Sequence, residues 1–129
     1  MRNPVAFIAF ALLISGCAAS PQRPGAVEGD IDRGAQLFAR GRGETPACTS
    51  CHLVTPGQVG FSIGPNLAGI GERAANRLEG LNASEYLRQS IVEPRRYVVT
   101  GYRDMMYAAY KTHLSEQDIL DLLAYLLTL

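Results

Sequence analysis

Residues Cys48-Thr49-Ser50-Cys51-His52 place two thiols three positions apart and an imidazole directly after the second thiol. This spacing is typical of covalent haem attachment, because each thiol can form a thioether with one vinyl group of the same porphyrin. His52 then lies beside the ring, where a neutral imidazole nitrogen can bind the iron as the proximal ligand. The stretch therefore predicts one covalently bound haem c.

Two other chemistries use closely spaced cysteines. A thiol–disulfide switch is expected at a strand-to-helix junction, and the sequence has no convincing alternation of polar and apolar residues that would predict a strand. A structural zinc site needs four ligands, and downstream of the haem-attachment stretch the chain offers only His113 and the thioethers of Met105 and Met106. Haem attachment is therefore the favoured interpretation.

The first residues indicate export. Arg2 supplies a positive charge, and Val5 to Ile14 form an apolar segment that is too short for a comfortable transmembrane helix, as in a secretory signal. The stretch Leu13-Ile14-Ser15-Gly16-Cys17 resembles the lipobox of bacterial lipoprotein precursors. Residues 1–16 are therefore predicted to be a lipoprotein signal peptide, with Cys17 acylated as the mature N-terminus. Ordinary cleavage nearby, or an uncleaved anchor, would leave Cys17 without a role.

Residues 17–29 are predicted to be the lipidated cysteine and a flexible tether, since the stretch is rich in Pro and Gly and has few apolar side chains. The folded domain, residues 30–129, would then be exported and held at a membrane, facing the periplasm or the cell exterior. Of the three cysteines, two are assigned to haem and one to lipid, so none is left for a disulfide. The 12 basic and 12 acidic residues balance without forming a basic stripe, which gives nucleic-acid binding no support.

Helix signals predict an all-α domain with three main helices. The first should begin at Asp30 or Asp32, whose carboxylate can cap free amides, and end near Ala39. Capping boxes at Asn82–Glu85 and Ser115–Asp118 mark the starts of the middle and terminal helices. The terminal helix is expected to bury the side chains of Ile119, Leu122, Leu123, Tyr125 and Leu126.

Two long loops are expected between these helices, over residues 53–71 and 95–113. Neither stretch shows helical periodicity, and loops of this length usually wrap a ligand or carry function. Within the first helix, Gly34 has no side chain, so another helix can approach it closely.

These motifs, in this order, resemble those of the class I cytochromes c, and the resemblance covers residues 30–129. In that family the first helix carries a glycine and an aromatic residue, matched here by Gly34 and Phe38. The last helix crosses it steeply, with Leu122 and Tyr125 matching the contact residues. The resemblance implies the cytochrome c fold, in which crossing N- and C-terminal helices and long loops enclose one covalent haem.

The resemblance also implies the proximal contacts. The segment Gly64-Pro65-Asn66-Leu67 matches the family segment behind the ligand histidine. By that match the Pro65 carbonyl accepts a hydrogen bond from the second nitrogen of His52, which orients the ring and raises its basicity. Leu67 would pack on the haem face.

On the distal side, the family places an axial methionine eight residues ahead of the leucine that precedes the last helix's serine cap. Counting back from Leu114 gives Met106, and a shift of one residue in the loop would give Met105 instead. His113 is a weaker third candidate. A proline usually follows the axial methionine, whereas this chain has Tyr107, so the loop is expected to be more mobile than usual.

The implied function is that of an electron carrier that cycles haem iron between Fe(II) and Fe(III), with redox proteins as partners, above all membrane respiratory or photosynthetic complexes. With both axial positions filled by His52 and Met106, no enzymatic activity of its own is expected. A fixed electron-transfer subunit of a larger membrane complex is the alternative. A haem sensor or weak peroxidase that loses the methionine ligand is a third reading. The haem propionates receive no assigned partner; candidates in the distal stretch are Arg95, Arg96, Tyr97 and Tyr102.

Overall fold

The computed structural model describes residues 28–58 and 62–129. The predicted signal peptide, Cys17 and all but the last two residues of the predicted tether lie outside the described residues. Within the two described ranges, no helix combines the length and the apolarity that crossing a bilayer requires.

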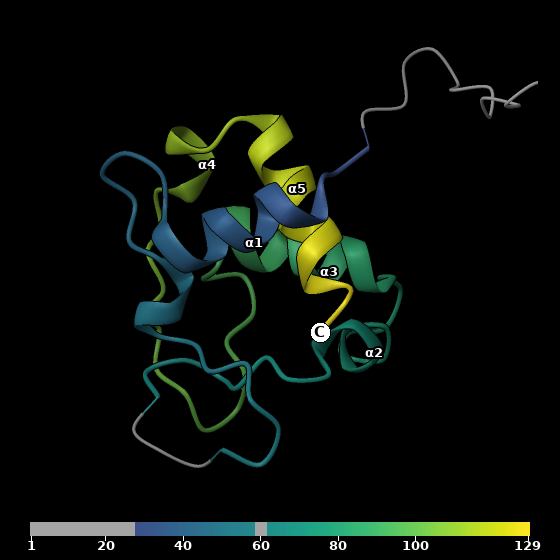
Figure 1. Cartoon of the computed structure of the whole chain (residues 1–129). Helices are drawn as coiled ribbons and strands as arrows, with labels where there is room; N and C mark the ends of the chain where they lie inside the picture. Colours follow the sequence, from purple (N-terminus) through teal and green to yellow (C-terminus); the bar gives the residue numbers. More distant parts are fainter. Residues whose placement is uncertain (1–27, 59–61) are drawn as a thin grey trace, which may run out of the picture.

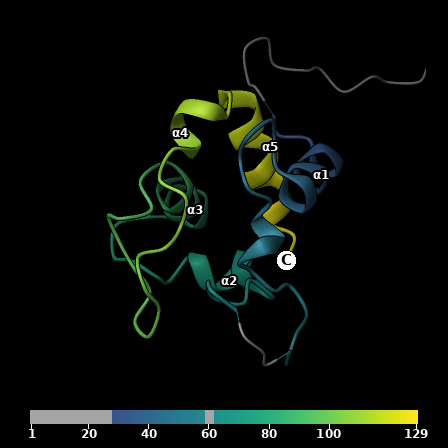
Figure 2. The same ribbon diagram turned by 90° about the vertical axis from the view of Figure 1, so that its left-hand side faces the viewer.

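The described residues form helices and loops, with no strand among them, which confirms the predicted all-α class. The elements, in chain order, are α1 (Ile31–Arg40), the 3-10 turn η1 (Cys48–Ser50), α2 (Ile70–Ala74), α3 (Ala83–Val92), α4 (Tyr110–His113) and α5 (Glu116–Leu126). Helices α1 and α5 cross in close contact, and α3 packs on α5 (Figures 1 and 2). The loop that leads into α4 and the η1 turn lie on different sides of the molecule's centre (Figure 2).

The starts of the three main helices follow the local signals in the sequence. The Asp30 carboxylate accepts the Arg33 backbone N–H at 2.9 Å, so α1 begins at Ile31. Both predicted capping boxes are formed, with Asn82 capping α3 and Ser115 capping α5. Each cap satisfies amides that have no partner inside the helix, and each contributes about 1 kcal/mol.

Two short helices were not predicted. Helix α2 begins at Ile70, inside the expected loop 53–71, and α4 occupies the end of the expected loop 95–113. Each is too short to show a helical period, and isolated helices of this length are unstable in water. Tertiary contacts hold them instead: Ile70 is buried in the core, and the Tyr110 hydroxyl donates to the Pro46 carbonyl at 3.0 Å.

The crossing of α1 and α5 depends on Gly34. A Cβ at this position would overlap the backbone carbonyl of Asp121 and lie 2.8 Å from the Cβ of Tyr125. The rings of Phe38 and Tyr125 meet one turn further on, with their centroids 5.4 Å apart. The close approach expected at Gly34 is therefore confirmed, and it brings the first and last helices of the domain together.

A buried carboxylate, which the sequence did not reveal, ties this crossing to the start of α1. The Asp121 side chain is fully buried and accepts hydrogen bonds from the Asp30 backbone N–H at 2.7 Å, Arg33 Nε at 2.9 Å and Gln117 Nε2 at 2.8 Å. The sequence alone assigns no role to Asp121. Its burial is tolerated because its hydrogen bonds and the Arg33 cation replace the water it loses.

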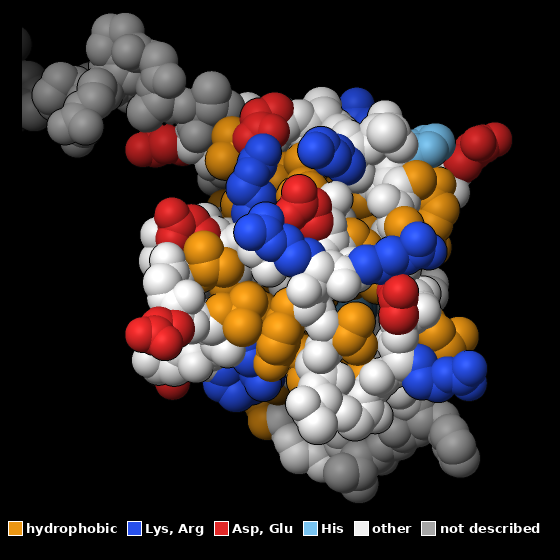
Figure 3. All heavy atoms as spheres, turned by 180° about the vertical axis from the view of Figure 1, so that it is seen from behind, with side chains coloured by type: hydrophobic (Ala, Val, Ile, Leu, Met, Phe, Trp, Pro, Cys, Tyr) orange, Lys and Arg blue, Asp and Glu red, His pale blue; other side chains and the backbone are white. Residues whose placement is uncertain are grey.

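The core lies where α1, α2, α3 and α5 meet. Its buried apolar residues are Phe38, Ile70, Ala74, Tyr86, Leu87, Ile91, Tyr110, Leu114, Ile119, Leu122, Leu123 and Leu126. This set includes four of the five residues expected on the buried face of the terminal helix; the fifth, Tyr125, is half-buried and packs against the core. On the face seen in Figure 3, basic and acidic side chains are interspersed.

Candidate functional site

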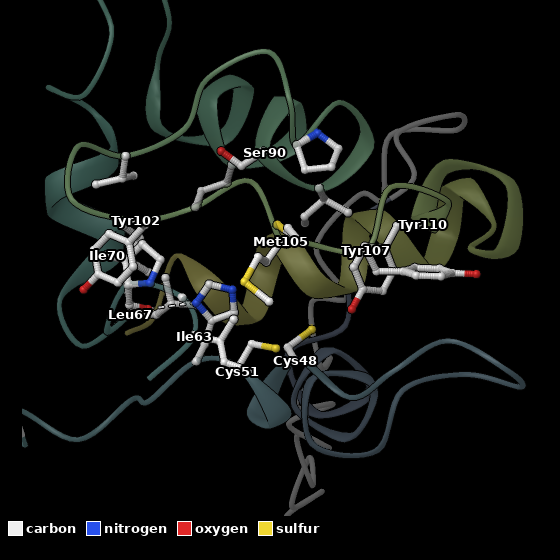
Figure 4. A pocket seen from close by; sticks show the side chains of 18 of the residues that line it. Cys48, Cys51, Ile63, Leu67, Ile70, Ser90, Tyr102, Met105, Tyr107 and Tyr110 are labelled. Atoms are coloured by element: carbon white, nitrogen blue, oxygen red, sulfur yellow. Dashed lines mark hydrogen bonds between the residues drawn. The ribbon is translucent and has the colours of Figure 1, made fainter. Parts of the chain in front are cut away.

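The Cys48–His52 stretch folds into a tight turn. The backbone N–H groups of Cys51 and His52 both donate to the Cys48 carbonyl, at 3.1 and 2.9 Å, so the chain winds once between the two cysteines. The Thr49 hydroxyl also contacts the Ala39 carbonyl of α1 at 3.3 Å. Both thiols point into the same cavity (Figure 4). This is the arrangement that two thioether bonds to one planar ligand require.

The His52 ring has a defined orientation and tautomer. Its Nδ1 lies 2.8 Å from the Pro65 carbonyl oxygen, which can only accept, so Nδ1 carries the proton and Nε2 keeps its lone pair. Burial lowers the pKa of His52, and the hydrogen bond to Pro65 opposes this effect more weakly. The imidazole is therefore neutral at pH 7, which is the form that binds a metal.

Backbone hydrogen bonds hold the Pro65 segment behind the histidine. The Gly64 N–H donates to the Cys51 carbonyl at 2.9 Å, and the Leu67 N–H donates to the Leu53 carbonyl at 2.7 Å. A Cβ at Gly64 would overlap the His52 ring, so only glycine allows this segment to pass so close. The Gly-Pro-Asn-Leu segment and the Cys48–His52 turn thus form one unit.

The side chains of this unit line a cavity of about 370 Å³, within the range of cofactor sites. Its lining residues come from all the helices and from the loops between them, and they are mostly apolar. Tyr107 and Tyr110 lie at the Cys48 end of the cavity, whereas Ile70 and Tyr102 lie at the other end (Figure 4). Leu67, predicted to pack on the haem face, is among the lining residues.

Both methionines named as distal candidates line this cavity, but their environments differ. Met106 is half-buried and packs against the core cluster, whereas the Met105 residue is 56% exposed. The ring of Tyr107, which follows Met106, packs edge-on against that of Tyr110, with 5.1 Å between the centroids. The third candidate, His113, is exposed and does not line the cavity; its ring lies 6.0 Å from that of Tyr107.

The donor set fits a covalent haem. The thiols of Cys48 and Cys51 and the neutral imidazole of His52 lie on one turn of the chain. The loop before α4 brings two methionine side chains to the same cavity, and the remaining lining residues are mainly apolar. Burial raises the pKa of the Cys48 thiol to about 11, so this side chain is a neutral thiol at pH 7. Among the described residues, no group of three or more His, Cys, Asp or Glu side chains is arranged to hold a metal ion.

Tyr110 and Arg77 are among the lining residues to which sequence reasoning gave no role. Tyr110 belongs to the unpredicted helix α4, and Arg77 follows the unpredicted helix α2. An arginine without a motif around it resembles any surface residue in sequence, and only the folded chain brings it to the cavity wall.

One family model matches most of the chain. The family model described as cytochrome c matches residues 31–129, which is the whole described domain except its first residues. No curated protein sequence matches the chain. The all-helical fold, the thiol-imidazole turn and the apolar cavity agree with what this family requires: a covalent haem c whose iron transfers electrons. This chain therefore belongs to the cytochrome c family.

Proposed function

We propose that this cytochrome c is a lipid-anchored electron carrier with one haem, whose iron is ligated by His52 and Met106. The observation that carries the proposal is the cavity in which the Cys48–His52 turn and the methionine loop meet. Cys48 and Cys51 would form the two thioether bonds. Bound there, the haem supplies one-electron chemistry through its iron.

The chain's own residues would set how that chemistry runs. The Pro65 carbonyl orients the His52 imidazole and increases its basicity. The thioether of Met106 would favour the reduced metal and so would raise the potential. Leu67 and the other apolar lining side chains exclude water from the site. If His52 and Met106 both hold the iron, the protein would pass electrons to partners rather than bind a substrate at the metal.

Burial favours Met106 over Met105 as the sixth ligand. A coordinating side chain is withdrawn from solvent, and Met106 packs on the core, whereas Met105 is largely exposed. The test is the weak sulfur-to-iron band in the far-red spectrum of the ferric holoprotein. Met106→Ala should abolish this band, and Met105→Ala should keep it. If both variants keep the band, the assignment of Met106 is wrong.

The membrane location rests on the residues outside the described part. We propose that residues 1–16 are a lipoprotein signal peptide, that Cys17 is acylated, and that residues 17–29 tether the domain of residues 30–129 to a membrane, facing the periplasm or cell exterior. Intact mass of the mature protein tests this, because it reports acyl groups and haem together. Cys17→Ser should lose the acyl mass and keep the haem mass.

The partners we propose are membrane respiratory or photosynthetic complexes, which a tethered carrier meets by diffusion along the bilayer. Docking would be brief and through a small interface. Extraction in mild detergent tests the mode of action: release as a free monomer supports the carrier. Co-purification with integral-membrane subunits in fixed proportion would make the protein a permanent subunit instead.

A further inference from the structure

The Nε atom of Arg77 is buried and has no hydrogen-bond partner among the described residues. It is the one buried side-chain nitrogen or oxygen of the described part with this property. The same residue lines the cavity that contains Cys48, Cys51 and His52. An unsatisfied polar group in a native interior needs a physical explanation.

No acidic side chain supplies that explanation. The ion pairs among the described residues use five other arginines, and Asp104, which also lines the cavity, is paired with Arg95 at 3.4 Å. A guanidinium is always charged, and burying part of it without an acceptor costs several kcal/mol. The backbone nevertheless fixes Arg77 at this place, since its N–H donates to the Ala74 carbonyl at the end of α2.

The missing acceptor corresponds to a chemical group that the family's cofactor carries. A haem has two propionate carboxylates, on a different part of the ring from the vinyl groups that join the cysteines. In the cavity, Ile70, the first residue of α2, lies at the end opposite Tyr107 and Tyr110, and Cys48 lies nearer to those tyrosines than to Ile70 (Figure 4). Arg77 follows α2 by three residues, so it belongs to the α2 border of the cavity.

We propose that Arg77 binds a haem propionate, with its Nε–H donating to the carboxylate. A planar guanidinium matches a carboxylate with two parallel donors, and such a pair is stronger than a neutral hydrogen bond. The pairing also holds the positively charged guanidinium of Arg77 next to the haem. This inference depends on the family's haem and is independent of which methionine is the sixth ligand.

The redox behaviour of the holoprotein tests the proposal. Arg77→Gln removes a cation beside the haem, which should lower the midpoint potential. Loss of the pairing should also raise the pKa of the propionate by about 1 to 3, so the pH range over which the potential changes should move upward relative to the wild type. Arg77→Lys keeps the charge, so its midpoint potential should lie between those of the wild type and Arg77→Gln. Arg40→Gln removes the same charge from the surface of α1, away from the cavity, and should leave the profile unchanged.

A potential-versus-pH profile of Arg77→Gln that matches that of Arg40→Gln would overturn the proposal. If Arg77→Gln does not mature with haem, the wild-type holoprotein still decides the question by NMR of its arginine side chains. The Nε–H of Arg77 should exchange slowly with solvent and should carry a paramagnetic shift in the ferric state. Fast exchange at Arg77, with no such shift, would refute the pairing.

Discussion

The Nδ1 atom of His52 lies 2.8 Å from the carbonyl oxygen of Pro65, thirteen residues further along the chain. This one hydrogen bond selects the tautomer that leaves Nε2 free, and it fixes the plane of the ring before any metal is bound. It forms because Gly64, which has no side chain, lets the segment pass against the imidazole. The proximal site is therefore organised by the backbone as much as by its histidine.

Gly64→Ala tests this organisation. The new Cβ would overlap the His52 ring, so the ring or the Pro65 segment must move, and we expect a lower yield of haem-loaded protein and a lower midpoint potential. Absorption of the reduced haem and a redox titration measure the two effects. The control is Gly43→Ala. Gly43 has a φ of 57°, so alanine there should lower the stability of the fold by about 1 kcal/mol, but its Cβ would meet no atom within 4 Å. Equal haem yield and equal potential in both variants would contradict the prediction.

Gly34→Ala should weaken the crossing of α1 and α5. The Cβ would collide with the Asp121 backbone, and overpacking of this kind costs about 1–3 kcal/mol even after relaxation. Alanine would otherwise favour the helix, so a loss of stability can only come from the contact with α5. Urea unfolding of the holoprotein measures the change. Gln36→Ala, at an exposed position of the same helix, should change the free energy of unfolding by less than about 0.5 kcal/mol.

Asp121 should contribute to stability in a pH-dependent manner. Burial alone would raise its pKa, but hydrogen bonds from the Asp30 N–H, Gln117 and Arg33 outweigh burial and lower the pKa. Because the folded pKa is below the unfolded value of about 3.9, the stabilisation is complete above that value and is lost as the pH falls through the folded pKa. The wild type should therefore lose stability in acid, below about pH 4.

Asp121→Asn should be less stable than the wild type at pH 7 by about 1–3 kcal/mol, because Arg33 loses its buried partner. The difference should shrink in acid, and thermal unfolding at a series of pH values measures it. Glu116→Gln is the matched control, since Glu116 pairs with Arg88 at the surface, where solvent screens the pair and its contribution to stability is small. A constant difference between wild type and Asp121→Asn at all pH values would refute the assignment.

Tyr107 should restrain the methionine loop in place of the usual proline. Its ring packs edge-on against Tyr110, which in turn is fixed to the Pro46 carbonyl. Removing the ring in Tyr107→Ala forfeits about 0.5–1.5 kcal/mol of aromatic contact, so an added imidazole should displace the sixth ligand up to about tenfold more readily. Spectral titration of the ferric protein with imidazole measures this. Tyr107→Phe keeps the ring and should behave like the wild type; if it binds imidazole as readily as Tyr107→Ala, the ring is not the restraint.

The parts of the fold that were predictable depend on residues close together in the chain. The caps at Asp30, Asn82 and Ser115 act over three residues, so their effect is visible in the sequence and recurs in the structure. Helices α2 and α4 were not predictable, because residues far apart in the chain stabilise them, as the hydrogen bond from Tyr110 to Pro46 illustrates.

The sequence by itself determined the haem-attachment chemistry, because two thiols and an imidazole at the spacing of Cys48, Cys51 and His52 have few other uses. Only the tertiary structure decided which polar groups face the cofactor cavity and which are buried elsewhere. No motif in the sequence singles out Asp121 or Arg77, yet Asp121 is buried with its partners and Arg77 reaches the cavity with its Nε unpaired among the described residues. The reason is that burial and pairing are properties of the space between elements distant in sequence, which a local pattern does not encode.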